Sequence, residues 1–95
     1  MVRYLVLVKF TEQGLKNVKK STSRAAAFRE AASKSGVEVE AQYWTVGRYD
    51  GFVVLRAEQE SNILRAIASL AAEGNVRTQS LRALDAKEFE AVAGK

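Results

Sequence analysis

The chain has neither cysteine nor histidine among its 95 residues. Without cysteine it has no disulfide, no thiol nucleophile and no cysteine-ligated zinc site. Without histidine it lacks the side chain that proteins use most often as a general base and as a metal ligand. Proline is absent as well, which excludes a cis-proline turn. We therefore expect no metal ion and no cofactor, and any catalysis would depend on Asp, Glu, Lys, Arg, Tyr, Ser or Thr.

Long apolar runs are also missing. The sequence contains no stretch of about 18 apolar residues, which is the length that a membrane-spanning helix needs. The beginning of the chain is continuously apolar only from Tyr4 to Val8, and it lacks the longer apolar region and small-residue cleavage site of a signal peptide. The length corresponds to one domain, residues 1–95, with a thin hydrophobic core. We expect a soluble cytoplasmic protein without a membrane partner.

The net charge of +4 is unevenly distributed. Residues 1–36 carry eight Lys/Arg and two Glu, a charge of +6, and the remainder carries −2. The basic half could recognise an anionic partner, and the side chains available for this are Lys16, Lys19, Lys20 and Arg24. No nucleic-acid-binding motif is present, and the aromatic residues do not interleave with the basic cluster. We therefore do not expect a nucleic acid as partner, and the alternative of a basic adaptor for another anionic partner stays open.

The pattern of apolar residues predicts four strands and three helices. The strands are expected at residues 3–10, 37–47, 51–57 and 75–84. The helices are expected at residues 22–35 with Ser21 as N-cap, from the N-cap Ser61 to about Glu73, and after Asp85, which forms a capping-box pattern with Glu88. The polar connection between residues 11 and 21 is expected to hold about one helical turn.

The predicted order, βαββαβ followed by a short helix, is that of a ferredoxin-like α+β fold. It implies a four-stranded antiparallel sheet with two helices on one face. Right-handed crossovers place the first and third strands at the centre, and these are the two with continuously apolar segments. In the second strand, alternation places Val37, Val39, Ala41 and Tyr43 on one face and the polar residues between them on the other.

Central strands that are apolar on both sides imply that both faces of the sheet are covered. The short final helix is too small to cover the second face alone. A second copy of the sheet would cover it in a two-fold dimer of the α/β-barrel kind, with Trp44 and Val46 at the contact. The alternative is a monomer in which the final helix folds over the open face.

Three segments of the chain resemble the GYD-domain family, which is named for a Gly-x-Tyr-Asp element. That element reads Gly47-Arg48-Tyr49-Asp50 here. The stretches FTEQGLKNVKKS and GNVRTQSLRAL, on either side of it in the sequence, are similar to the opening segment and the last strand of the family. The resemblance implies a ferredoxin-like fold of the dimeric α/β-barrel type and supplies no activity. The chain departs from the family pattern after the third strand, where Arg56 replaces an acid and Glu58 replaces a proline.

The Gly-x-Tyr-Asp element allows two interpretations. In the structural one, Asp50-Gly51 forms a type I′ turn, or the bend lies at Gly47 and the Asp50 carboxylate binds nearby backbone N–H groups. In the functional one, Asp50 is a general base, Tyr49 or Tyr43 donates a hydrogen bond, and Trp44 forms an apolar wall. The second interpretation describes a cofactor-independent enzyme that acts on a small apolar substrate.

The sequence favours a non-catalytic homo-oligomeric binding or assembly module over this enzyme. A small-molecule pocket is expected between the sheet and the helices, where Trp44, Gln13 and Asn17 are the candidate binding residues. Gln13 and Asn17 have an alternative role, which is to satisfy backbone groups of the irregular segment that contains them.

Overall fold

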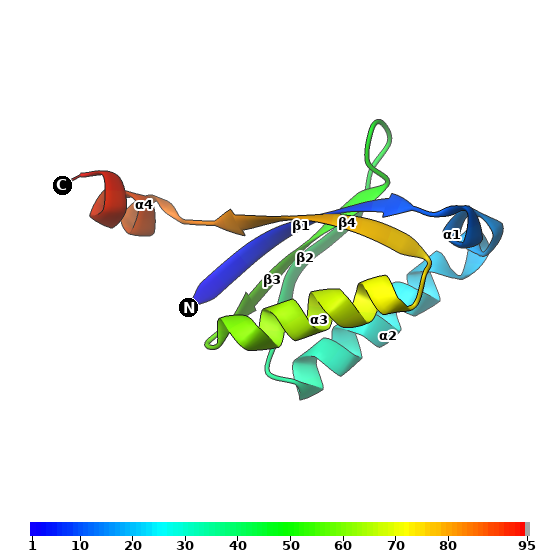
Figure 1. Ribbon diagram of the computed structural model, residues 1–95, viewed down its shortest axis with the longest axis horizontal. Coiled ribbons are helices and arrows are strands. Elements are labelled where there is room, and N and C mark those ends of the chain that lie inside the picture. Colours follow the sequence, from blue (N-terminus) through cyan, green and yellow to red (C-terminus); the bar gives the residue numbers. More distant parts are fainter. Residues whose placement is uncertain (95) are drawn as a thin grey trace.

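The computed structural model describes residues 1–94 and has the predicted ferredoxin-like α+β architecture (Figure 1). The sheet has the order β2-β3-β1-β4, and all neighbouring strands are antiparallel. Helices α2 and α3 lie on one face of the sheet (Figure 1). The elements are β1 Val2–Phe10, α1 Glu12–Lys16, η1 Val18–Lys20, α2 Ser21–Lys34, β2 Glu38–Trp44, β3 Gly51–Ala57, α3 Glu60–Ala72, β4 Val76–Ala83 and α4 Ala86–Ala93.

Two of the three predicted N-caps are wrong. The short helix η1 continues directly into α2, so Ser21 already has helical backbone angles and cannot act as the cap. Helix α3 begins before Ser61, with Gln59 in the extended cap position. The third prediction is confirmed, because the Asp85 side chain accepts from the Glu88 backbone N–H and the Glu88 side chain accepts from the Asp85 backbone N–H.

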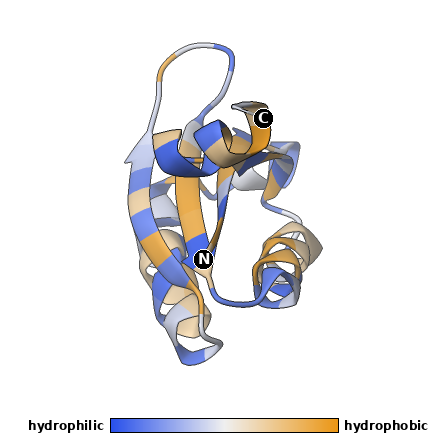
Figure 2. Ribbon diagram, turned by 90° about the vertical axis from the view of Figure 1, so that its left-hand side faces the viewer, coloured by the Kyte–Doolittle hydropathy of each residue, from blue (hydrophilic) through white to orange (hydrophobic). Residues whose placement is uncertain are grey.

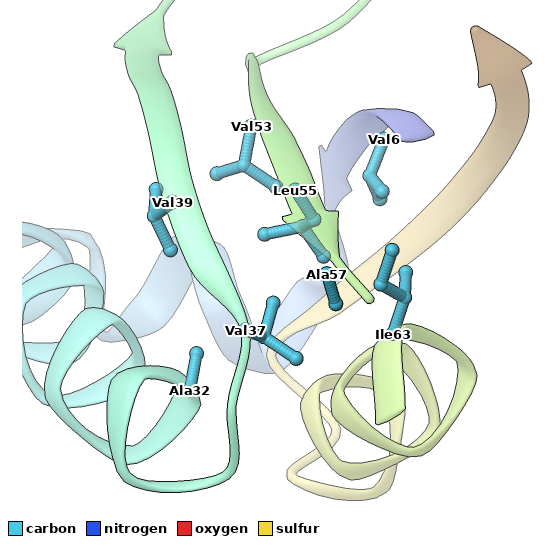
Figure 3. Close-up of a cluster of buried hydrophobic side chains, with 8 residues drawn as sticks. All are labelled: Val6, Ala32, Val37, Val39, Val53, Leu55, Ala57 and Ile63. Atoms are coloured by element: carbon cyan, nitrogen blue, oxygen red, sulfur yellow. The ribbon is translucent and has the colours of Figure 1, made fainter. Parts of the chain in front are cut away.

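The core lies between the sheet and the two long helices (Figure 3). Its largest fully buried side chains are Leu55, Ile63, Val6 and Val37. The cluster contains eight buried residues, none of them aromatic, which is the thin core expected for a chain of this length. Tyr4 packs beside it and donates a hydrogen bond from its hydroxyl to Glu60 on α3 at 2.7 Å.

A β-bulge in β2 changes the predicted alternation. Val39 pairs with Leu55, but Ala41 pairs with the next residue of β3, Val54, so β2 contains one extra residue there. Beyond the bulge, Ala41 and Tyr43 therefore lie on the face opposite the helices. The prediction that they share a face with Val37 and Val39 is wrong.

The side of the sheet opposite the helices, which we call the open face, has an apolar centre. Two rows of directly paired residues cross all four strands on this face. They are Ala41, Val54, Leu5 and Leu81 in one row, and Tyr43, Phe52, Leu7 and Gln79 in the other. Tyr43 is 61% exposed and Leu81 is 42% exposed, and the remaining apolar members are partly exposed.

Helix α4 does not cover this apolar centre. It projects from the end of β4, away from the sheet and from α2 and α3 (Figure 1). The helix carries both apolar and polar residues (Figure 2), and its Phe89 and Val92 are 59% and 70% exposed. The chain fold therefore differs from the alternative in which the final helix closes over the sheet. Within residues 1–94, no helix has the length and apolar character needed to span a membrane.

Candidate functional site

A cavity of about 80 Å³ lies between the sheet and helices α2 and α3, at the end of the sheet where β1 finishes. Its apolar lining includes Val8, Phe10 and Val76 from the sheet and Phe28 and Leu70 from the helices. Its polar lining comprises Ser21, Arg24, Gln42, Tyr43, Trp44, Asp50, Glu73 and Asn75. The sequence predicted a pocket at this place in the fold but named only some of these residues.

Trp44 lines this cavity from the last position of β2. It pairs with Gly51 on the helix side of the sheet, and its indole Nε1 donates a hydrogen bond to the Ser21 hydroxyl at 2.9 Å. The bulge thus separates Trp44 from the open face, where the sequence had placed it with Val46 in a self-contact. Val46 itself lies in the following loop and is fully exposed.

The loop between β2 and β3 bends at Gly47. Gly47 has a φ of 140°, whereas Asp50 and Gly51 are not among the positive-φ positions of residues 1–94. A type I′ turn needs positive φ at both of its central residues, so Asp50-Gly51 does not form one. The loop is closed instead by Thr45, which donates from its backbone N–H to Asp50 O at 2.9 Å and from its hydroxyl to Tyr49 O at 2.6 Å.

Asp50 is bound to the end of strand β1. Its backbone N–H donates to Val8 O at 2.8 Å, and its carboxylate Oδ2 accepts from the backbone N–H of Phe10 at 2.8 Å. The side chain therefore continues the hydrogen-bond ladder between β1 and β3 beyond the last backbone pair, Val8 and Gly51. The carboxylate borders the cavity but makes its hydrogen bond with a backbone amide.

The two tyrosines do not join Asp50 in a catalytic group. Tyr49 reaches across the open face to β4, where its hydroxyl donates to Gln79 Oε1 at 2.6 Å. Tyr43 borders the cavity with its strand, and its ring stacks on that of Phe52 with a centroid separation of 5.4 Å. In neither case does the structure record a hydrogen bond between a tyrosine hydroxyl and the carboxylate.

Gly51, predicted from the sequence to be a turn residue, is required for a different reason. It is buried in β3 opposite Trp44, and a Cβ at this position would lie 2.6 Å from the carbonyl oxygen of Tyr43. Strands β2 and β3 approach too closely here for a side chain. The glycine thus provides space rather than an unusual backbone conformation.

Gln13 and Asn17, the other two candidate binding residues, are not among the residues that line the cavity. Gln13 Nε2 donates to Glu73 O at 3.1 Å and to Asn75 Oδ1 at 3.0 Å. Asn17 Nδ2 donates to Gln13 O at 3.1 Å. Both side chains instead fix the α1 segment to itself and to the connection between α3 and β4, as the alternative interpretation of the sequence expected.

The basic cluster of residues 16–24, which extends from the end of α1 into the first turn of α2, makes several contacts within the chain. Lys16 lies 3.9 Å from Glu12, and Arg24 donates from Nη1 to Asn17 O at 2.7 Å. Lys19 and Lys20 are exposed in η1. Among residues 1–94 there is no group of three or more Asp or Glu side chains placed to hold a metal ion.

A charged network at the other end of the open face was not anticipated from the sequence. Arg3 Nε contacts Glu40 Oε1 at 2.6 Å, and Arg56 Nη1 contacts Glu40 Oε2 at 3.4 Å. Arg3 also lies 3.8 Å from Glu88 of α4, and Arg56 lies 4.0 Å from Glu38. The hydrogen bond from Arg3 is the main cause that lowers the pKa of the Glu40 carboxyl. Arg56, the departure from the family pattern, belongs to this network.

Comparisons with known proteins agree with this fold. The chain is 33% identical over 85 residues to a Thermus thermophilus protein named glutamine synthetase and cystathionine beta-lyase binding protein, with coverage of 88% of this chain and 90% of the relative. The crystal structure of TTHA0845, also from Thermus thermophilus, is similar in fold, with a TM-score of 0.58, 21% identity, and coverage of 90% of this chain and 96% of that one.

A homoserine dehydrogenase from Thiobacillus denitrificans contains a similar fold in part of its length. The TM-score is 0.57 at 21% identity, with coverage of 88% of this chain and 17% of the dehydrogenase. At this identity the likeness concerns the fold alone. The family model described as GYD domain matches residues 4–93, which is nearly the whole chain, and the chain therefore belongs to the GYD domain family.

Proposed function

We propose that the protein is a non-catalytic binding module that functions as a homodimer, with the open faces of two copies in contact. The observation that carries the proposal is an excess of exposed surface. The chain exposes 6420 Å², whereas a compact monomer of its mass exposes about 5,400 Å². The excess of roughly 1,000 Å² is close to the ~800 Å² that each partner contributes to a standard protein interface.

The composition of the open face supports a second copy as the partner. Its centre is apolar, and a two-fold interface requires such a self-complementary patch. One end carries the two basic residues Lys9 and Arg77, which occupy directly opposite positions on the neighbouring strands β1 and β4. The other end carries three acids, Glu38, Glu40 and Glu88, around two arginines. A two-fold axis that runs across the strands would bring the basic end of each copy to the acidic end of the other.

A binding function also agrees with the name of the Thermus thermophilus relative, which describes it as a binding protein for two enzymes. On this likeness we propose that the partner of the present chain is an enzyme as well. The positions of the candidate catalytic side chains support a role without chemistry. Asp50 is bound to a backbone amide and Tyr49 to Gln79, so neither is free to act as the sequence alternative required.

Sedimentation velocity over a range of protein concentrations tests the homodimer. We expect a species of about 21 kDa, twice the mass of the 10.5 kDa chain. The variant Leu81→Glu places a charge in the apolar centre of the open face and should sediment as a monomer. Leu64→Glu is the matched control, because Leu64 is exposed to a similar degree, 47% against 42%, but lies on α3. A wild-type chain that remains at 10.5 kDa at every concentration contradicts the proposal.

A further inference from the structure

We propose that the cavity between the sheet and helices α2 and α3 binds a small monocarboxylate with a short apolar body. The carboxylate would be held by Arg24 and Ser21, and the apolar body would lie against Phe28 and Leu70. This inference names the ligand of the binding module proposed above. It rests on the proposed binding role of the chain. It does not depend on the homodimer, because the cavity lies within one copy of the chain.

The size and lining of the cavity set the apolar part of the ligand. Phe28 and Leu70 come from the two helices, and Val8 and Val76 come from neighbouring strands, so apolar side chains converge from both layers. The volume of about 80 Å³ is roughly half of the ~150 Å³ cavity that accommodates benzene in another protein. An apolar body of about three carbon atoms, such as an isopropyl group, is therefore the appropriate size, and a large aromatic or a long acyl chain is not.

The order of the cavity residues along helix α2 predicts the orientation of the ligand. Ser21, Arg24, Ala25 and Phe28 all line the cavity, and their spacing of three and four residues places them on one side of the helix. The polar residues precede the apolar one along the chain. The ligand is thus expected to lie along α2, with its polar end at the first turn and its apolar end beside Phe28.

The polar end of the cavity has hydrogen-bond donors to offer. The Ser21 oxygen already accepts from the Trp44 indole, which leaves the Ser21 O–H as a donor. Arg24 donates one recorded hydrogen bond, from Nη1 to Asn17 O, in the part of the chain that the structure describes, and a guanidinium has five N–H groups. A guanidinium matches the geometry of a carboxylate, which can accept two parallel hydrogen bonds from Arg.

The acidic residues at the cavity limit the ligand to a single negative charge. Asp50 and Glu73 both border the cavity. Their carboxylates repel negative charge, so a ligand with a single negative charge beside Arg24 is disfavoured less than a phosphate or a dicarboxylate. The Asp50 carboxylate accepts a hydrogen bond from the backbone N–H of Phe10, so a polar partner for it is present within the chain. One arginine and one hydroxyl are sufficient for one carboxylate.

Titration of the wild-type chain with three probes that share a carbon skeleton, and with inorganic phosphate, tests the inference. The probes are 3-methylbutanoate, the uncharged 3-methylbutan-1-ol, the cationic 3-methylbutylamine, and inorganic phosphate. Trp44, the single tryptophan, borders the cavity and gives a fluorescence signal. We expect saturable binding of the carboxylate, with the alcohol roughly ten- to hundredfold weaker because a charge-assisted hydrogen bond is lost. Equal binding of the alcohol, or stronger binding of the amine or phosphate, overturns the proposal.

Two variants on the same helix localise the site. Arg24→Gln should reduce the affinity for 3-methylbutanoate to that for the alcohol, whereas Arg29→Gln, an exposed arginine of α2 outside the lining, should leave it unchanged. Circular dichroism establishes that each variant is folded, and Ser21→Ala provides a second, milder test at the same polar end. Binding that is unaffected by both cavity variants overturns the assignment. A wild-type dimer that binds none of the probes contradicts this inference alone, whereas a monomer that binds the carboxylate contradicts only the homodimer.

Discussion

The carboxylate of Asp50 accepts a hydrogen bond from the backbone N–H of Phe10 at 2.8 Å, although 40 residues separate them in the chain. The acid of the family element thereby continues the ladder between the two central strands past its last backbone pair. Tyr49, the adjacent residue, ties the same loop to β4 through Gln79. Asp50 thus connects the β2–β3 loop to β1, and Tyr49 connects the same loop to β4. These two hydrogen bonds give the Tyr-Asp pair of the family element a structural role.

Asp50→Ala should destabilise the protein by about 1–3 kcal/mol, because it leaves the Phe10 N–H without its partner in a partly buried position. The midpoint of urea unfolding, followed by circular dichroism, measures the change. Glu58→Ala is the control, since Glu58 is an exposed acid after β3 that has no recorded hydrogen bond or ion pair with any side chain of residues 1–94. If Asp50→Ala unfolds at the same urea concentration as the control variant, the hydrogen bond to Phe10 does not stabilise the fold.

Tyr49→Phe should cost about 0.5–1.5 kcal/mol of stability, because it removes the hydroxyl that donates to Gln79 and retains the ring. A double-mutant cycle with Gln79→Ala isolates the contact. We expect the second substitution to have less effect in the Tyr49→Phe background than in the wild type. Strictly additive effects would indicate that the hydrogen bond does not form in solution.

Gly14→Ala should destabilise the protein by about 1–3 kcal/mol through overpacking. Gly14 is the buried residue of α1, and a Cβ there would lie 2.0 Å from the carbonyl oxygen of Asn75, a backbone atom that cannot rotate away. The measurement is the thermal unfolding midpoint. Leu15→Ala serves as the comparison, because Leu15 is the next residue of the same helix and is 58% exposed. A smaller loss for Gly14→Ala than for Leu15→Ala would contradict the close approach of α1 to Asn75.

Much of the fold follows from the sequence because the apolar pattern of each strand reflects its position. The continuous apolar runs of β1 and β3 predict their central places, and the order β2-β3-β1-β4 confirms this. The bulge in β2 could not be predicted, since the residues from Glu38 to Tyr43 alternate without a break and only the pairing with β3 reveals the extra residue. The predicted self-contact therefore placed Trp44 on the wrong side of the sheet, whereas the candidate binding role had placed it on the helix side, where it lies in the structure.

The candidate site was predicted less completely for the same reason. Gln42 became a cavity residue only through the bulge, and it now donates from Nε2 to Ala25 O at 3.3 Å. The sequence identified Arg24 only as one member of a basic cluster. Its place in the cavity with Phe28 depends on how α2 packs. The network of Arg3, Glu40 and Arg56 had a weak signal, because opposite charges on β2 and β3 were visible but their register was not.

The free energy of unfolding of Glu40→Gln should fall less in acid than that of the wild type. In the folded state the pKa of Glu40 is lowered from its ordinary value of 4.5, first by the hydrogen bond from Arg3, so the ionised form is favoured by folding. The contribution is present above pH 4.5 and is lost as the pH falls through the lower pKa of the folded state. Glu40→Gln should therefore be less stable than wild type at pH 7, and the difference should shrink between about pH 5 and pH 3.

Urea unfolding at several pH values measures this difference. Glu30→Gln is the control, since Glu30 is an exposed acid whose recorded ion pair is with Lys34 of the same helix. A difference from wild type that stays constant with pH would show that the Glu40 carboxyl has the same pKa in the folded and unfolded states.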